Sequence, residues 1–278
     1  MTVDIAATAQ LACLLEASAP KPGNVSPGRH FTDIRYEHFL ASASAIGTAF
    51  AEAGSRSVGE TILRAAKATS LWTRSNTNLG IVLLLAPLAR AAAAGGDLRA
   101  ALRSVLASTT VADARDVYAA IRLASPGGLG ETAEQDVHDE PTVTLLEAMT
   151  LAAGHDGIAN EYATAFAITF ETAVPTLLRA RADGLSWDDG VVETFMTVLA
   201  ASPDTHVARR GGPELAAEIS QRAADVLHAG GVRSAERRKA LGYFDHSLRD
   251  PRNIGNPGTT ADLTAAAIFV ALLQGAWT

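Results

Sequence analysis

Apolar residues recur at helical spacing along almost the whole chain, and this periodicity is the feature that most constrains its fold. Alanine and leucine fill many of these positions, as in the run 91–94, and both favour helices because they lose little side-chain freedom there. Alternating segments rich in Val, Ile and Tyr, which are typical of strands, are not evident. Aromatic residues make up 5% of the chain and hydrophobic residues 48%, so the core must consist mainly of aliphatic side chains. The sequence predicts an all-α fold.

The periodic segments indicate a single compact helical domain over residues 1–278. No repeat of fixed period and no Pro/Ser-rich linker divides the chain, and 278 residues are enough to bury a large core. We expect the Ala/Leu-rich helix 79–94 to be buried at the centre. The expected helices are 6–17, 39–53, 59–72, 79–94, 98–107, 113–123, 142–153, 158–181, 188–200, 214–228, 234–249 and 260–275.

Charge, cysteine content and apolar run length exclude several classes of protein. A formal net charge of −7 disfavours nonspecific binding to nucleic acid, although a small basic pocket is still compatible with it. Cys13 is the single cysteine, so we expect neither a disulfide framework nor a thiolate metal cluster, and we interpret it as a core residue. The longest apolar run, 79–89, is shorter than the roughly 20 residues of a membrane span. The first residues lack the basic segment of a signal peptide, so we expect a cytoplasmic protein that does not bind membranes.

Two junctions, far apart in the sequence, lead directly from polar residues into an apolar helix. The first is Asn76-Thr77-Asn78 before the helix 79–94, and the second is the segment 256–262. Asn and Thr at such positions are typical of helix N-caps, and the positive end of the helix dipole favours an anion such as phosphate. The pair of junctions hints at one polar site built from helix ends, whereas two ordinary caps are the simpler alternative for each junction alone.

Five long polar loops separate the expected helices. Loops of this length in an all-α protein are either functional or loosely ordered. Neither the Walker phosphate loop nor the glycine-rich dinucleotide fingerprint is present, so a nucleotide would have to bind in another way. The loops are 18–33, 72–78, 125–141, 202–213 and 250–260.

Segments in these loops resemble, in the same order, motifs of the triphosphoribosyl-dephospho-CoA synthase family. Together they span residues 16 to 265, nearly the whole chain. The chain departs from the family in two motifs, because the His-Lys of the family's NTHKG is Asn78-Leu79 here and GSHTDM is altered over residues 28–34. The resemblances pair 20–26 and 28–33 with PKPG…GSHTDM, 75–80 with GVNTHKG, 128–131 with GxRGE, 204–212 with DTNxxxRGG, and 256–263 with SPGGSADLLA.

The resemblance implies an all-α transferase that acts on small molecules. The family joins ATP to 3′-dephospho-CoA and releases adenine, which forms the precursor of the prosthetic group of citrate and malonate lyase-type acyl carriers. It therefore implies ATP and dephospho-CoA, or a related cofactor precursor, as substrates. The acidic chain with its Ala-rich helices is compatible with a monomer or a homodimer.

The reaction that the resemblance implies sets out what the site must contain. Displacement of adenine from the ribose of ATP by an alcohol has an oxocarbenium-like transition state, which calls for a carboxylate near the sugar and a base for the hydroxyl. The triphosphate calls for cations, N–H donors and Mg²⁺ held by oxygen ligands. We expect Asp33, Glu131 and Asp204 to be the catalytic carboxylates, with Asp204 and Asp262 as ligands of Mg²⁺.

The cationic residues of the loops are candidates for phosphate binding. Lys21 lies between two prolines, and Arg209 and Arg210 precede two glycines that allow a ligand to approach the chain closely. A solvated loop lysine and a salt bridge to Asp204 are the alternatives. The expected substrate-binding residues are Lys21, Gly23, His30, Asn76, Thr77, Asn78, Arg209, Arg210, Asn256, Gly258 and Thr259.

Two groups of residues, and the function itself, each have more than one interpretation. His30 with Asp33 fits a base or metal pair, or a polar loop stabilised by an Asx turn. Thr259 and Asp262 match the Ser/Thr-x-x-Asp/Glu cap pattern, so Asp262 is either a metal ligand or a capping residue. The alternative functions are an Mg²⁺-dependent hydrolase of ADP-ribose-type glycosidic bonds and a non-catalytic nucleotide-binding helical protein.

Overall fold

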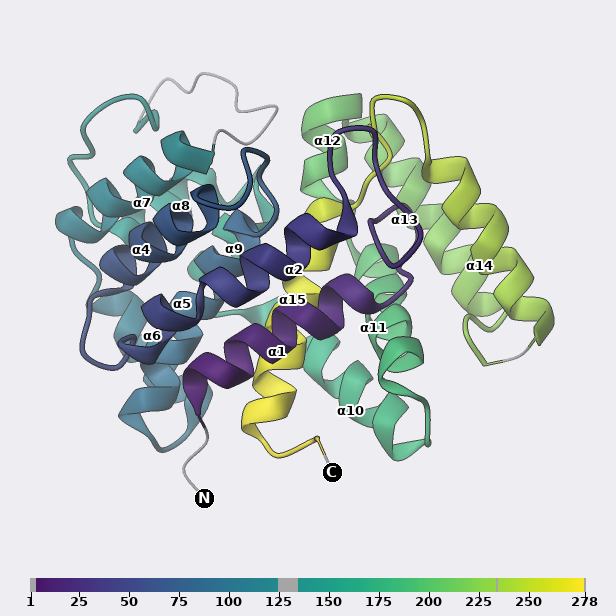
Figure 1. Ribbon diagram of the computed structural model, residues 1–278, viewed down its shortest axis with the longest axis horizontal. Coiled ribbons are helices and arrows are strands. Elements are labelled where there is room, and N and C mark those ends of the chain that lie inside the picture. The colour runs from purple at the N-terminus through teal and green to yellow at the C-terminus, as the bar shows by residue number, and fades with distance from the viewer. Residues whose placement is uncertain (1–3, 125–134, 234, 278) are drawn as a thin grey trace. The chain divides into compact units, whose positions relative to one another are not determined.

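The computed structural model describes residues 4–124, 135–233 and 235–277, and throughout these residues the regular secondary structure is helical. A lone bridge between Ser26 and Arg29 is the one β-type pairing among them. The prediction of an all-α fold is therefore confirmed (Figure 1). Cys13 is buried, as expected of a core residue.

The chain divides into two compact units. Unit 1 comprises Met1–Cys13 and Glu37–Ala167, and unit 2 comprises Leu14–Tyr36 and Ile168–Thr278. Each unit therefore consists of two separate stretches of sequence. The single domain over residues 1–278 stays a prediction, and the two units are described one at a time.

Unit 1 is built around α5 (Leu79–Ala94), in which every residue from Ile81 to Ala89 is buried. This helix packs against α4, α6, α7 and α9. The prediction of a buried Ala/Leu-rich helix at 79–94 is confirmed with the same bounds. The other helices of this unit are the start of α1 (Ile5–Ser18), most of α2 (Tyr36–Ala45), α3 (Gly47–Ala51), α4 (Val58–Ser70), α6 (Leu98–Ala107), α7 (Val111–Ala124), α8 (Leu145–Ala152) and α9 (Gly157–Ala163).

A proline lies inside α5 and would be expected to weaken it. Pro87 has no N–H, so the carbonyl of Leu83, four residues earlier, receives no helical hydrogen bond. The hydroxyl of Tyr162 donates to this carbonyl at 2.6 Å instead. Tyr162 is 1% exposed, so the bond forms where water cannot replace it. The side chain from α9 thus supplies the donor that the proline removes.

Helices α4 and α7 approach so closely that one contact position accepts no side chain. A Cβ added to Gly59 would lie 2.5 Å from the Cα of Asp113. The Asp113 carboxylate accepts hydrogen bonds from the Gly59 N–H at 2.8 Å and from the N–H and hydroxyl of Thr110 at 2.9 and 2.8 Å. Burial raises the pKa of the Asp113 carboxyl, but these bonds, with one from Ser57, outweigh it and hold the pKa below its ordinary value.

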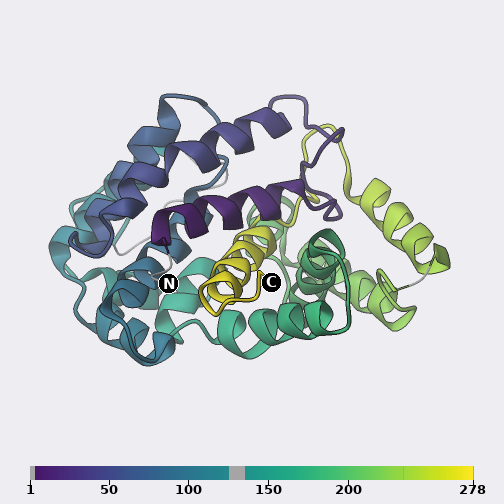
Figure 2. The same cartoon turned by 60° about the horizontal axis from the view of Figure 1, so that its bottom comes forward.

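Unit 2 contains a second helix that is buried along most of its length, α15 (Gly258–Leu273). Every residue from Leu263 to Leu272 is buried, and the helix packs against α10, α11 and α12. Figures 1 and 2 both show it, in yellow, beside the green helices α10 and α11. The remaining elements are the end of α1, the π-helical turn η1 (Thr169–Ala173), α10 (Val174–Ala182), α11 (Trp187–Ala201), α12 (Thr205–Gly211), α13 (Pro213–His228) and α14 (Ala235–Leu248).

Three expected segments differ from the structure. The helix expected at 158–181 is interrupted, because Ala165 and Phe166 take positive φ values of 50° and 60°. Phe166 is nevertheless fully buried, so the apolar periodicity continues across the break and hides it from the sequence pattern. The helix expected at 39–53 divides at Ile46 into α2 and α3, and the loop expected at 202–213 contains α12.

Among the described residues, no single helix has both the length and the apolar composition needed to cross a membrane. The helices α5 and α6 meet these criteria only when taken together, across a bend of 114°.

Candidate functional site

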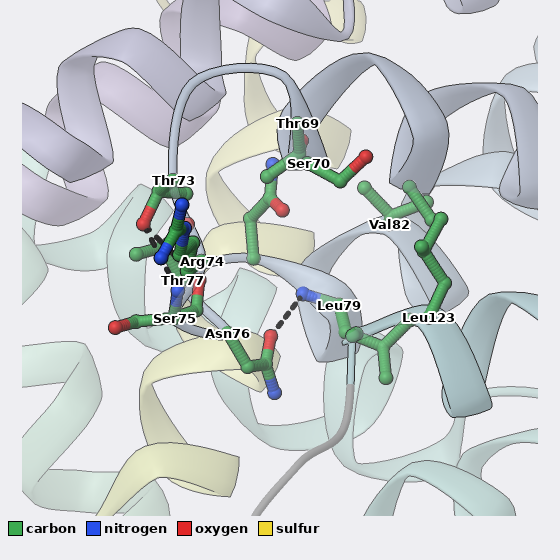
Figure 3. A pocket seen from close by; sticks show the side chains of 13 residues that line it. Thr69, Ser70, Thr73, Arg74, Ser75, Asn76, Thr77, Leu79, Val82 and Leu123 are labelled. Carbon is green, nitrogen blue, oxygen red and sulfur yellow. Dashed lines mark hydrogen bonds between the residues drawn. The ribbon is translucent and has the colours of Figure 1, made fainter.

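A cavity of about 220 Å³ lies at the N-terminal end of α5 in unit 1. Its wall combines the last turns of α4, the connection 71–78, the first turn of α5 and the end of α7. Figure 3 shows the polar side chains of Thr73, Arg74 and Ser75 on one side in this view, with Val82 and Leu123 on the other. Within the described part of the chain, the cavity therefore combines a polar wall with an apolar one. Its other lining residues are Ala66, Thr69, Ser70, Asn76, Thr77, Asn78, Leu79 and Ala124.

Side chains of the connection itself hold its backbone in place. The Ser75 N–H donates to the Thr73 hydroxyl at 3.1 Å, and the Leu79 N–H donates to the Asn76 Oδ1 at 3.0 Å (Figure 3). The second bond caps the first free N–H of α5. The N-cap residue of α5 is Asn78, whose side chain makes no capping hydrogen bond, so the side-chain acceptor at this junction comes from Asn76, two residues earlier.

Thr77 and Asn78 are buried and turn toward Ser42 of α2 rather than toward solvent. The Ser42 hydroxyl donates to the His38 carbonyl at 2.7 Å and is hydrogen-bonded to the Thr77 hydroxyl, and the Asn78 amide donates to the Ser42 carbonyl at 3.4 Å. These contacts anchor the connection on α2. Ser42 was missed by the sequence analysis, since a serine inside an Ala/Ser-rich helix carries no signal that it supports a loop 35 residues away.

In unit 2 the Asp204 carboxylate caps two helices at once. It accepts from the Val207 N–H of α12 at 2.9 Å, and from both the N–H and the hydroxyl of Thr260 of α15 at 2.7 Å. Burial raises the pKa of the Asp204 carboxyl, and the hydrogen bonds act in the opposite direction without cancelling the shift. Its predicted roles as catalytic carboxylate and Mg²⁺ ligand stay predictions, and these contacts already occupy three of the roughly four acceptor positions of the carboxylate.

The start of α15 is held by small residues and a threonine pair. The Thr259 hydroxyl is hydrogen-bonded to that of Thr205 at 3.0 Å, and a Cβ added to Gly258 would lie 3.2 Å from the His206 ring. Because α15 begins at Gly258 with Pro257 as its N-cap, Thr259 lies inside the first turn. Thr259 therefore does not occupy the N-cap position of the Ser/Thr-x-x-Asp/Glu pattern, and both alternatives for Asp262 stay predictions.

Two further predicted residues lie at this end of α15. Asp262 is half-buried on the helix, and its role as a ligand of Mg²⁺ stays a prediction. The Oδ1 atom of Asn256 is buried, and the described residues offer it no hydrogen-bond partner.

Lys21 is fully buried, contrary to the solvated loop lysine that was its alternative. Its ammonium pairs with the Glu16 carboxylate at 2.9 Å and donates to the carbonyls of Glu16 and Ala19. All three ammonium hydrogens thus have acceptors within the protein, which leaves none for a phosphate in this structure. Phosphate binding by Lys21 stays a prediction that requires these contacts to open.

Gly23 belongs to a network centred on Asp245 of α14. Gly23 has a φ of 75° and donates its N–H to the Asp245 carboxylate at 2.8 Å. The same carboxylate pairs with Arg29 at 2.7 Å and with Arg249 at 2.8 Å, and Arg249 also donates to the Asn24 carbonyl at 2.7 Å. Asp245 and Arg249 could not be recognised from the sequence, because an Asp and an Arg four residues apart are typical of an exposed helix surface.

His30 and Asp33 are both exposed. The His30 Nδ1 accepts from the Tyr36 N–H at 3.2 Å, a contact that favours the structured polar loop among the two alternatives. Arg209 and Arg210 are exposed on α12, and Arg210 donates to the carbonyls of Arg252 and Asn253.

Glu131 lies outside the described residues. Among the residues that are described, no group of three or more His, Cys, Asp or Glu side chains is placed to hold a metal ion.

The comparison with protein families decides which one this chain belongs to. A family model described as ATP:dephospho-CoA triphosphoribosyl transferase matches residues 2–278. The chain belongs to this family. The transferase membership suggested by the five loop segments is thereby confirmed, and the comparisons give no support to the glycohydrolase or non-catalytic alternatives.

Individual relatives within the family agree with this assignment. A 2-(5″-triphosphoribosyl)-3′-dephosphocoenzyme-A synthase of Klebsiella pneumoniae is 31% identical over 119 residues, 43% of this chain and 42% of its own length. One of Pectobacterium atrosepticum is 34% identical over 122 residues, 44% and 38% of the two lengths. This chain thus spans less than half the length of these curated relatives.

A solved structure matches over a larger part of the chain. It is the crystal structure of a protein from Archaeoglobus fulgidus assigned as a triphosphoribosyl-dephospho-CoA synthase, and it is 35% identical. The match covers 85% of this chain and 99% of that chain, with a TM-score of 0.66. The fold described above is therefore shared with a protein of the same family assignment.

The family segments fall in different parts of this transferase-family chain. Residues 75–79 of the segment 75–80 line the cavity of unit 1, and the segments 20–33, 204–212 and 256–263 belong to unit 2. One polar site built from both helix junctions stays a prediction, because one junction lies in each unit.

Proposed function

We propose that this protein transfers triphosphoribose from ATP to a hydroxyl of 3′-dephospho-CoA or a related cofactor precursor. The bond between C1′ of the ATP ribose and the adenine nitrogen breaks, and a bond from C1′ to the acceptor oxygen forms. The acceptor hydroxyl loses its proton, and adenine leaves with one proton more than it carried in ATP. The observation that carries this proposal is the match to the transferase family over residues 2–278.

Of the predicted carboxylates, we assign the catalytic role to Asp33. It is exposed, whereas the Asp204 carboxylate is buried and surrounded by three hydrogen-bond donors. A carboxylate near C1′ stabilises the positive charge that develops on the sugar, or accepts the proton of the attacking hydroxyl. An exposed carboxylate can do either without first losing partners inside the protein.

We propose that Mg²⁺ enters with the phosphates of ATP. Magnesium typically keeps several waters and binds through one or two carboxylates together with substrate phosphates, so a complete protein cage is not required. Asp262, which is half-buried near the start of α15, is the residue that we assign to it. The ion would neutralise phosphate charge. Since the reaction consumes ATP, we place it in the cytoplasm, and either a monomer or a homodimer is compatible with it.

The test is to incubate the purified protein with ATP, Mg²⁺ and 3′-dephospho-CoA and to measure free adenine by chromatography. We expect adenine in the complete mixture, and a product whose mass equals that of the acceptor plus triphosphoribose. Adenine in equal amount without acceptor would indicate hydrolysis instead. No adenine with 3′-dephospho-CoA or with related acceptors would overturn the proposal.

A further inference from the structure

Among the described residues that line the cavity at the N-terminal end of α5, one has a charged side chain, and this residue is the cationic Arg74. We propose that Arg74 binds the phosphate chain of a substrate in this cavity. The inference rests on the proposed function, because both ATP and dephospho-CoA carry a phosphate chain. It adds a binding residue that lies outside the motif segment 75–80.

Arg74 differs in its contacts from three other arginines of unit 1, and it differs from Arg103 of α6, which is also unpaired among the described residues, because it lines the cavity. Arg56, Arg64 and Arg115 each pair with a glutamate on the surface. Among the residues that the structure describes, none forms a hydrogen bond or ion pair with the Arg74 guanidinium, although the chain carries a net charge of −7. An arginine left unpaired on the wall of a polar cavity is suited to an anionic ligand, since its planar fork matches two phosphate oxygens.

The connection that carries Arg74 keeps its shape without help from this side chain. The Thr73–Ser75 and Asn76–Leu79 hydrogen bonds fix the backbone on either side of it. Thr77 is further anchored on α2 by its hydroxyl. The guanidinium therefore has no structural role in the loop, and binding a phosphate would not require the loop to rearrange.

The rest of the cavity also favours negative charge. Its described lining includes hydroxyl and amide side chains but no carboxylate. At the start of α5, the N–H groups of Gly80 and Ile81 have no acceptor among the described residues, and they contribute to the positive end of the helix dipole. The Lys of the family's NTHKG is Leu79 here, and the positively charged side chain that lines this cavity is Arg74, five residues earlier in the chain.

The size of the cavity indicates that it holds part of a substrate. Its volume of about 220 Å³ is below the roughly 300–1,000 Å³ of pockets that enclose a whole drug-sized ligand. A nucleotide or a dephospho-CoA molecule is too large to be enclosed in it. A phosphate chain that enters from one end is the part of either substrate that the lining matches.

The binding test uses inorganic tripolyphosphate and pyrophosphate, measured by titration calorimetry on the full-length protein. The variants are Arg74→Ala, Arg74→Lys and, as a matched control, Arg103→Ala, which removes another exposed arginine of unit 1 on α6. We expect Arg74→Ala to weaken tripolyphosphate binding about 10- to 100-fold, as for the loss of hydrogen bonds to a charged group. Arg74→Lys keeps the positive charge but loses the planar, two-pronged guanidinium. Its affinity for tripolyphosphate should therefore lie between that of the unmodified protein and that of Arg74→Ala.

Three results would overturn the inference. They are undetectable tripolyphosphate binding by the unmodified protein, equal binding by Arg74→Ala, and an equal loss in Arg103→Ala. Circular dichroism of each variant shows whether it is folded. If Arg74→Ala is unfolded, the tripolyphosphate affinity of Arg74→Lys tests the inference in its place.

The adenine assay then identifies the source of the phosphate chain. A raised KM for ATP in Arg74→Ala assigns the cavity to the triphosphate, and a raised KM for dephospho-CoA assigns it to the diphosphate. If neither KM rises, the inference fails while the proposed function stands. If the unmodified protein binds tripolyphosphate through Arg74 but releases no adenine, the proposed function fails and the phosphate site stands.

Discussion

The hydrogen bond between Tyr162 and the Leu83 carbonyl provides a sharp test of how α5 tolerates its proline. Pro87 leaves this carbonyl without a helical donor, and the tyrosine hydroxyl takes that place at 2.6 Å. We predict that Tyr162→Phe destabilises the protein, and that most of the effect disappears when Pro87→Ala is also present. In that background, the N–H of the new alanine can donate to the carbonyl itself.

The expected magnitude follows from the burial of both partners. Tyr162 is 1% exposed and Leu83 is 6% exposed, so water cannot replace the lost hydroxyl. A buried carbonyl left without a donor costs about 1–3 kcal/mol. The double variant leaves no such carbonyl, so the coupling free energy between the two substitutions should be about 1–2 kcal/mol, as for residues that share one network. Phe also retains the ring and its packing, so no cavity forms.

The assay is urea unfolding followed by circular dichroism for the unmodified protein, both single variants and the double variant. The free-energy differences are read from shifts in midpoint at unchanged slope, since a changed slope would signal a different unfolded or native state. If Tyr162→Phe costs the same with Pro87 in place as it does when combined with Pro87→Ala, the reasoning is refuted. A cost below about 0.5 kcal/mol with Pro87 in place would also refute it, because the carbonyl would then not need this donor.

Two further predictions concern the contact between α4 and α7. Gly59→Ala should destabilise the protein by about 1–3 kcal/mol, since its Cβ would lie 2.5 Å from the Asp113 backbone. Gly242→Ala on α14, where a Cβ meets nothing within 4 Å, should instead stabilise by up to about 1 kcal/mol through helix propensity, and urea midpoints compare the two. The lowered pKa of Asp113 means that its carboxylate contributes stability above its unfolded value of about 3.9, and this is lost as the pH falls through the lower folded value. The free energy of unfolding of Asp113→Asn should therefore fall less than that of the unmodified protein between pH 6 and pH 2. An equal fall in both would contradict the stabilising role of the ionised Asp113 carboxylate.

The sequence predicted the helices best where packing and local preference agree. The bounds of α5 followed from its apolar run and the polar residues before it, and Gly95 ends it with a φ of 76°. The break at Ala165 and Phe166 could not be predicted in the same way, because Phe166 continues the apolar period while its backbone leaves the helix. Asp113 is one of 30 acidic residues, and nothing in its neighbourhood along the chain indicates that it is buried against Gly59.

The candidate site was harder to predict, because the residue types that bind phosphate also hold loops together. Lys21 and Asp204 are ionisable loop residues in family segments, as a binding site requires, yet each is buried with partners from its own unit. Replacing those partners with a ligand means breaking charge-assisted hydrogen bonds in a buried setting, where an unmatched charge is costly. Arg74 and Asp33 are exposed, and neither has such partners among the described residues. The difference between these pairs is a matter of contacts rather than of residue type, so the groups available for chemistry can be recognised only after the internal hydrogen bonds have been assigned.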